Sequence, residues 1–111
     1  MKDLVERLAT HGTLAPGKPN NFMLKDLNGR WVKGSVQGRL EQGGWGAELG
    51  FPGLVLDPDG EAIEVDVFES PDLPAHWERL DNFEGDGYRR VKTKVDAPNG
   101  EIEAHIYILS K

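Results

Sequence analysis

The stretch LDNFEGDGYRR, from Leu80 to Arg90, places a carboxylate where an apolar side chain is expected. Upstream, Leu73, Trp77 and Leu80 recur at the three-and-four spacing that marks the buried stripe of a helix. The next position on that stripe is Glu84. The sequence therefore predicts an acid that points into the protein.

The helix that carries this acid is expected to span about Leu73 to Phe83. The preceding Ser70-Pro71-Asp72 offers capping oxygens and a proline that the first turn tolerates, and Gly85 ends the helix. Because a helix C-terminus carries partial negative charge, helix stability does not explain an acid at this position. The alternative interpretation is that the helix frays early and leaves Glu84 in solvent.

Length and composition predict one globular domain over residues 1–111. The chain is 38% hydrophobic and 29% charged, and no apolar run approaches the roughly 20 residues that a membrane span needs. Thirteen basic against 19 acidic residues give a net charge of −6, which argues against nucleic-acid binding. We expect neither a nucleic-acid nor a membrane partner, and a monomer by default.

The absence of cysteine limits the chemistry further. It excludes disulfides, thiolate catalysis and the common structural zinc sites. The N-terminal MKDLVERL lacks the apolar core of a secretory signal, so a cytoplasmic location is the expectation.

Fourteen glycines and seven prolines fall mostly between short apolar runs, which predicts many short strands interrupted by one or two helices. A glycine- and proline-rich loop is expected over 11–20, a hairpin turn over 57–60 and a final hairpin turn over 98–100. Alternation over 31–40 favours a curved strand with close backbone approach at its glycines. We expect strands over 5–10, 31–40, 51–56, 63–69, 88–95 and 101–109, and a short helix over about 20–27.

Several possible cofactor sites are excluded by spacing. Asp57, Asp59 and Glu61 resemble the first ligands of a calcium loop, but Ala62 and Phe68 stand where that loop requires a glycine and an acid. The chain's histidines, at 11, 76 and 105, lack the spacing of a zinc site. The glycine-rich run over 43–50 lacks the dinucleotide-binding register and is interpreted as a turn. We expect no metal and no cofactor.

A set of short motifs, taken in order, resembles the gamma-glutamylcyclotransferase-like family, in particular the gamma-glutamylamine cyclotransferases. The motifs cover nearly the whole chain and are HGTLAPGKPN over 11–20, GRL over 38–40, FPGL over 51–54, LDNFEGDGYRR over 80–90 and AHIYIL over 104–109. The resemblance implies an α+β fold, a small mixed β-barrel of about five to seven short strands with one or two helices. It also implies a small-molecule gamma-glutamyl substrate.

The resemblance implies roles for particular residues. The glutamate of the LDxxEG motif, here Glu84, serves as general acid and base, and the loop His11-Gly12-Thr13-Leu14 holds the glutamyl group. Tyr88 is a further candidate for substrate binding, with a core ring as the competing interpretation. In the implied reaction the substrate's own α-amine attacks its γ-carbonyl, so that 5-oxoproline forms and an amine leaves. Such an enzyme needs no nucleophile of its own, which suits a chain without cysteine.

Two positions depart from the family pattern, and both touch the expected pocket. His11 stands where a tyrosine is usual, and Ala15-Pro16 stands where a basic residue often follows the leucine. A histidine there adds a titratable group, which alters substrate choice or pH dependence, or marks a loss of activity. The alternative function is a non-catalytic module that binds a small acidic metabolite in the same pocket. The released amine is left open among amino acids, polyamines, a lysine side chain and antibiotic precursors.

Overall fold

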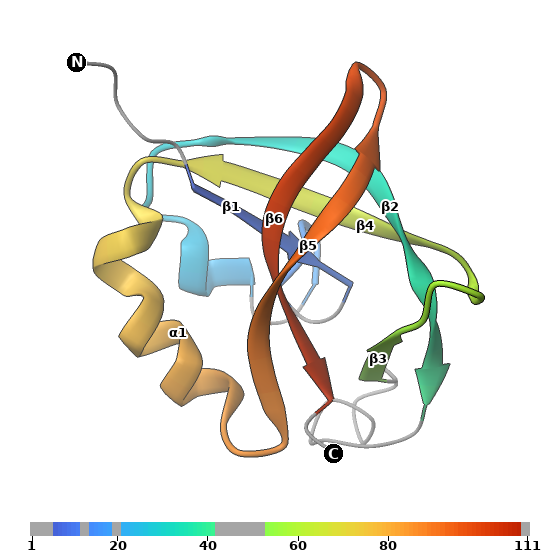
Figure 1. The fold of residues 1–111 in the computed structure, drawn as a ribbon. Helices are drawn as coiled ribbons and strands as arrows, with labels where there is room; N and C mark the ends of the chain where they lie inside the picture. Colours follow the sequence, from blue (N-terminus) through green and yellow to red (C-terminus); the bar gives the residue numbers. More distant parts are fainter. Residues whose placement is uncertain (1–5, 12–13, 19–20, 42–52, 110–111) are drawn as a thin grey trace.

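The computed structural model describes residues 6–11, 14–18, 21–41 and 53–109. Within them the chain forms six strands, two short 3₁₀ helices and one α-helix (Figure 1). Their bounds are β1 Glu6–Thr10, η1 Asn21–Leu24, β2 Arg30–Glu41, β3 Gly53–Leu56, β4 Glu61–Ser70, η3 Leu73–His76, α1 Trp77–Glu84, β5 Tyr88–Ala97 and β6 Gly100–Leu109.

The strands form a small closed barrel in the order β2-β4-β1-β6-β5. The barrel closes where Ser35 of β2 pairs with Asp96 of β5, and β3 adds to the end of β2. Strand β1 runs antiparallel to β4 but parallel to β6, so the barrel is mixed. Helix α1 packs outside it, between β4 and β5 in the chain (Figure 1). The predicted α+β mixed barrel is confirmed.

The close backbone approach predicted at the glycines of β2 also holds. A Cβ placed on Gly34 would lie 2.5 Å from Cγ1 of Val95 and 3.0 Å from the carbonyl oxygen of Asp96. These neighbours belong to β5, so Gly34 lies at the closure point of the barrel. A side chain here would force β2 and β5 apart.

Apolar side chains form two clusters, one on each side of the barrel wall. The cluster inside the barrel includes Val36, Val67, Val95 and Ile106. The second cluster lies under the helices and consists of Leu8, Leu14, Leu24, Leu27, Phe68, Leu73 and Leu80. Alternation along β6 explains the division, because Ile106 faces the inside while its neighbour Tyr107 packs against the second cluster.

The predicted helix over Leu73 to Phe83 is present, but its helix type and its N-terminal hydrogen bonds differ from the prediction. It begins as the 3₁₀ helix η3 and continues as α1, and its predicted side-chain cap is wrong. A carboxylate oxygen of Asp72 instead accepts from the backbone N–H of Asn28, 2.8 Å away. The Ser70 hydroxyl donates to the carbonyl of Asn28. Both side chains tie the helix start to a segment over 40 residues distant in sequence.

The turn over Asp57–Gly60 forms, but the hairpin predicted around it is wrong. The backbone N–H of Gly60 donates to the Asp57 carbonyl at 2.9 Å, and the Asp57 carboxylate accepts from the N–H of Asp59. In the described part of the chain, however, the flanking strands β3 and β4 both pair antiparallel with β2 rather than with each other. The turn residues determine the local bend, whereas the strand with which β3 and β4 each pair is determined by β2, which lies elsewhere in the sequence.

The other expected elements need smaller adjustments. The predicted helix over 20–27 is a single 3₁₀ turn, η1, and the final hairpin forms as predicted, with Ala97 opposite Gly100. Position 5, the glycine-rich run 43–50 and positions 51–52 of the expected third strand lie outside the described residues. In the described ranges, no helix has the length and apolar character to cross a membrane.

Candidate active site

Glu84 is the last residue of α1, and it is buried with 8% of its surface exposed. Leu73 and Leu80, which precede it on the same stripe, are fully buried. Gly85 then ends the helix at φ 79°, with its backbone N–H donating to the Asp81 carbonyl at 3.0 Å. The inward-pointing acid predicted from the periodicity is therefore present.

Burial changes the acid–base behaviour of this carboxyl. Removal from water disfavours the charged form and raises the pKa of Glu84 to about 7. The negative end of α1 does not favour the charge either. At neutral pH such a group populates both protonation states, so it can accept a proton and return it.

The loop expected to bind the glutamyl group is described in part. Leu14 is buried in the cluster that contains Leu80, one turn before Glu84. The Leu14 carbonyl accepts from the side-chain amide of Asn21 at 2.8 Å, which ties the loop to η1. Gly12 and Thr13, which were expected to offer backbone N–H groups, lie outside the described residues.

His11 directly follows β1, in a surface depression that it shares with Lys33 and Asp66. Among the described residues, those lining this depression do not include Glu84. Lys33 and Asp66 form an ion pair at 2.7 Å there. The structure therefore brings Leu14 to the cluster below α1 and places the His11 side chain in a different surface depression.

Tyr88 is half-buried at the start of β5, just after the loop that follows Glu84. It lines an open polar depression together with Asp81, Arg90 and Tyr107, and Gly85 also lies at its edge. Tyr88 and the end of α1 therefore meet at one surface hollow.

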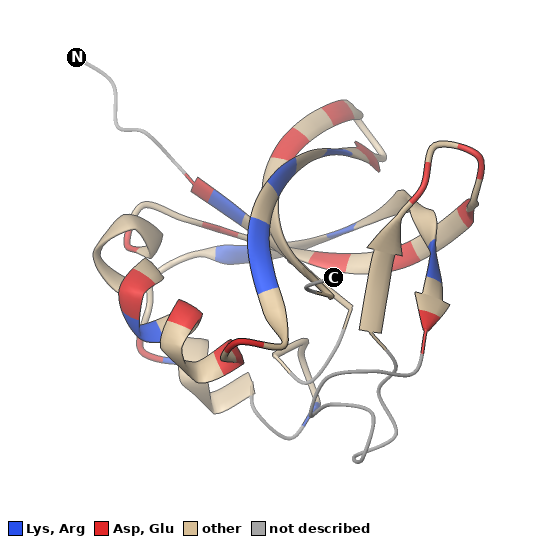
Figure 2. Cartoon of the chain, turned by 60° about the horizontal axis from the view of Figure 1, so that its bottom comes forward, with Lys and Arg blue, Asp and Glu red and all other residues tan. Residues whose placement is uncertain are grey.

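An ion pair links α1 to β5 beside this hollow. Nε of Arg90 donates to Oδ1 of Asp81 at 2.9 Å, and a second guanidinium nitrogen lies 3.3 Å from Oδ2. Figure 2 shows α1, which carries acidic residues, beside the start of β5, which carries basic residues. The hydrogen bond from Arg90, aided by one from Tyr107, holds the pKa of Asp81 below its ordinary value.

Tyr107 is the residue of this region that the sequence reasoning missed. Its hydroxyl donates to Oδ1 of Asp81 at 2.7 Å. Burial, followed by the hydrogen bond to Asp81 and the negative charges of Asp81 and Glu84, raises the pKa of Tyr107 well above the ordinary value, and the phenol therefore stays protonated. An available signal was the alternation in AHIYIL, where polar residues at 105 and 107 separate apolar residues of the barrel interior.

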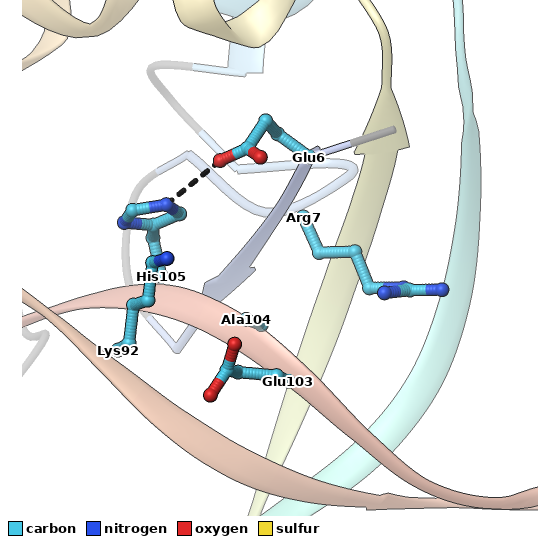
Figure 3. A pocket seen from close by; sticks show the side chains of 6 residues that line it. All are labelled: Glu6, Arg7, Lys92, Glu103, Ala104 and His105. Carbon is cyan, nitrogen blue, oxygen red and sulfur yellow. Dashed lines mark hydrogen bonds and ion pairs between the residues drawn. The ribbon is translucent and has the colours of Figure 1, made fainter. Parts of the chain in front are cut away.

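His105 extends the network away from the hollow. Its Nδ1 lies 2.9 Å from a guanidinium nitrogen of Arg90, and its Nε2 lies 2.9 Å from Oε1 of Glu6. The Trp77 ring covers both partners, with its centroid 4.2 Å from Cζ of Arg90 and 4.5 Å from the His105 ring. Figure 3 shows Glu6 reaching from β1 to His105 on β6 at a small pocket of about 110 Å³.

The described residues contain no group of three or more potential metal ligands. The interaction partners in the site are instead carboxylates, a guanidinium, a phenol and backbone groups. Such a set suits proton transfer and the binding of a charged small molecule.

Comparison with known proteins identifies the architecture. The family model described as "Gamma-glutamyl cyclotransferase, AIG2-like" matches residues 8–111. The structure of a mouse AIG2-like protein superimposes with a TM-score of 0.74 at 20% identity, covering 96% of this chain and 78% of that one. YkqA from Bacillus subtilis gives a TM-score of 0.74 at 24% identity, with 96% of this chain and 36% of the longer YkqA covered.

A structure named gamma-glutamyl cyclotransferase also shares the fold. It gives a TM-score of 0.66 at 16% identity and covers 97% of this chain and 68% of that one. No curated protein matches the sequence. At these identities the structural neighbours show a common fold, and the family assignment rests on the family model.

Proposed function

Because the chain belongs to the AIG2-like gamma-glutamyl cyclotransferase family, we propose that it is a gamma-glutamyl cyclotransferase with Glu84 as its general acid and base. The observation that carries this proposal is the burial of Glu84, which gives its carboxyl a pKa of about 7. A carboxyl with that pKa suits a group that must take up and release a proton in one cycle.

The proposed reaction conserves all atoms of the substrate. Glu84 removes a proton from the α-ammonium, and the amine nitrogen then attacks the γ-carbonyl carbon to form the new ring bond. Collapse of the tetrahedral intermediate breaks the original γ-amide bond, and Glu84 returns its proton to the leaving nitrogen. The ring nitrogen gives up its second ammonium proton by the same route, so the amine leaves in its protonated form. The products are 5-oxoproline and a free amine, and no water is consumed.

The chain around Glu84 supplies the remaining requirements in this proposal. Backbone N–H groups of Gly12, Thr13 and Leu14 bind the substrate carboxylate or the developing oxyanion, since adjacent amides form anion-binding concavities. Tyr88, which lines the hollow at the end of α1, contacts the outer part of the substrate, whereas His11 lines a separate depression and has no part in this proposal. The buried position of Leu14, near Leu80, supports a loop that approaches the end of α1.

The test is an activity panel. The purified protein is incubated with gamma-glutamyl amines and gamma-glutamyl amino acids, and 5-oxoproline is measured by mass spectrometry. Glu84→Gln should lose activity by on the order of 10²-fold or more, because the amide cannot carry the proton. Glu78→Gln, on the exposed side of the same helix, serves as the matched control and should retain activity.

Other outcomes would reject this proposal. If wild type binds members of the panel but turns none over, the protein is a binding module. Equal activity of wild type and Glu84→Gln would show that another group carries the proton. A preference among the active substrates would define the class of amine released.

A further inference from the structure

We propose that Tyr107 binds the α-ammonium group of the substrate as a hydrogen-bond acceptor, and that Asp81 and Arg90 are positioning residues that fix its hydroxyl proton. This inference rests on the proposed function and adds a recognition step to it. It follows from the direction of each hydrogen bond in the network described above.

The direction of the network begins at Arg90, because a guanidinium only donates. Its contact at 2.9 Å with Nδ1 of His105 therefore requires that Nδ1 accepts. The neutral His105 ring then carries its proton on Nε2, which donates to Glu6 at 2.9 Å (Figure 3). Trp77 packs against both the Arg90 guanidinium and the His105 ring.

The other end of the network reaches Tyr107. Asp81 is held by two contacts to the Arg90 guanidinium, at 2.9 and 3.3 Å, and accepts the Tyr107 hydroxyl proton at 2.7 Å. A tyrosine hydroxyl has one proton and two lone pairs. Because the hydroxyl proton is engaged in the hydrogen bond to Asp81, the Tyr107 oxygen can take part in further hydrogen bonds only as an acceptor.

Two observations place this acceptor beside the end of α1, the helix that carries Glu84. Asp81 and Glu84 are three residues apart on α1 and therefore share a face of the helix. Tyr107 also lines the depression bordered by Gly85, the residue after Glu84. The Glu84 charge contributes to the raised pKa of the Tyr107 hydroxyl, which agrees with this placement.

The arrangement selects for a particular ligand group. An ammonium offers three donors and no acceptor, so it can satisfy Glu84 and Tyr107 together. A ligand without the α-amine cannot make either bond. Tyr107 is thus expected to contribute to the preference for a free α-amino group, separately from the proton transfer by Glu84.

Binding measurements in a catalytically silent Glu84→Gln background test this inference. Each gamma-glutamyl compound that wild type turns over is titrated by calorimetry beside its glutaryl counterpart, which lacks only the α-amine. Adding Tyr107→Phe should weaken binding of the gamma-glutamyl compound by about 10-fold or more, the value of a charge-assisted hydrogen bond. Binding of the glutaryl compound should remain unchanged.

The positioning residues have their own readout. Asp81→Ala frees the Tyr107 proton and should reduce the same preference, while Asp81→Asn, which keeps one accepting oxygen, should restore part of it. Equal weakening of both ligands by Tyr107→Phe, or no weakening, would overturn the inference while leaving wild-type turnover intact. Absence of turnover by wild type would instead reject the proposed function and, with it, this inference.

Discussion

Replacing Glu84 by glutamine is expected to stabilise the protein at alkaline pH relative to wild type. The pKa of this carboxyl is about 7 in the folded protein and 4.5 when it is free in water. Between these values the folded state holds a proton that the unfolded state has released. The free energy of unfolding of wild type therefore falls as the pH rises from about 4.5 to about 7.

The magnitude follows from the two pKa values. Their difference is 7 − 4.5 = 2.5, and at ~1.36 kcal/mol for each pKa unit the charged carboxyl costs about 3 kcal/mol above pH 7. Part of this cost is already present at pH 5.5. Between pH 5.5 and 8.5 wild type should lose about 2 kcal/mol relative to Glu84→Gln.

Urea unfolding at pH 5.5, 7.0 and 8.5 measures this difference. Trp31 and Trp77 are half-buried beside the second cluster and report its loss through their fluorescence. The change in relative stability with pH is the quantity of interest, because any constant effect of the amide cancels in it. Glu78→Gln, an exposed substitution on the same helix, should follow the pH dependence of wild type.

Parallel stability curves for wild type and Glu84→Gln would refute the reasoning. They would mean that the carboxyl titrates alike in the folded and unfolded chain, so that burial does not hold its proton. The proposed acid–base role would then lose its physical basis, even if the variant were inactive.

Three further predictions concern activity and folding. The kcat/KM of wild type should rise with pH through about 7 as Glu84 ionises, and a flat profile from pH 5.5 to 8.5 would contradict a base with that pKa. Gly34→Ala should lower the free energy of unfolding by roughly 1–3 kcal/mol, because the new methyl would meet β5 at 2.5 Å; an unchanged urea midpoint would argue against tight closure there. Leu80→Ala should cost roughly 2–5 kcal/mol in the same assay, since the side chain is fully buried, and a loss below 1 kcal/mol would indicate that the cluster under α1 collapses around the gap.

The sequence was informative where local periodicity decides the structure. The stripe through Leu73, Trp77 and Leu80 predicted the inward direction of Glu84, and alternation with glycines predicted the close approach at Gly34. Both features depend on spacing within one element, which the sequence displays directly.

Sequence reasoning was wrong where a side chain or strand forms its hydrogen bonds with a distant segment rather than with its neighbours in the sequence. Asp72 has the chemistry of a helix cap, yet its carboxylate binds the backbone of Asn28. The turn over Asp57–Gly60 has the residues of a hairpin, yet the adjacent strands both pair with β2. Tyr107 was overlooked for a related reason, because its partner Asp81 is 26 residues away. The alternation in AHIYIL places the Tyr107 side chain outside the barrel, but no local pattern identifies Asp81 as its partner.

Asp81 and Glu84, two of the carboxylates of α1, show how environment assigns different tasks to the same chemistry. Asp81 and Glu84 lie three residues apart, yet the pKa of Asp81 is lowered and that of Glu84 is raised. Arg90 and Tyr107 donate to Asp81 and stabilise its charge, so Asp81 stays ionised and can orient its neighbours. Glu84 is removed from water at the end of the buried stripe, so its proton is exchangeable near neutral pH. Two neighbouring carboxyls whose pKa values are shifted in opposite directions are typical of acid–base sites. This difference is the physical reason to look for proton transfer at Glu84 rather than at Asp81.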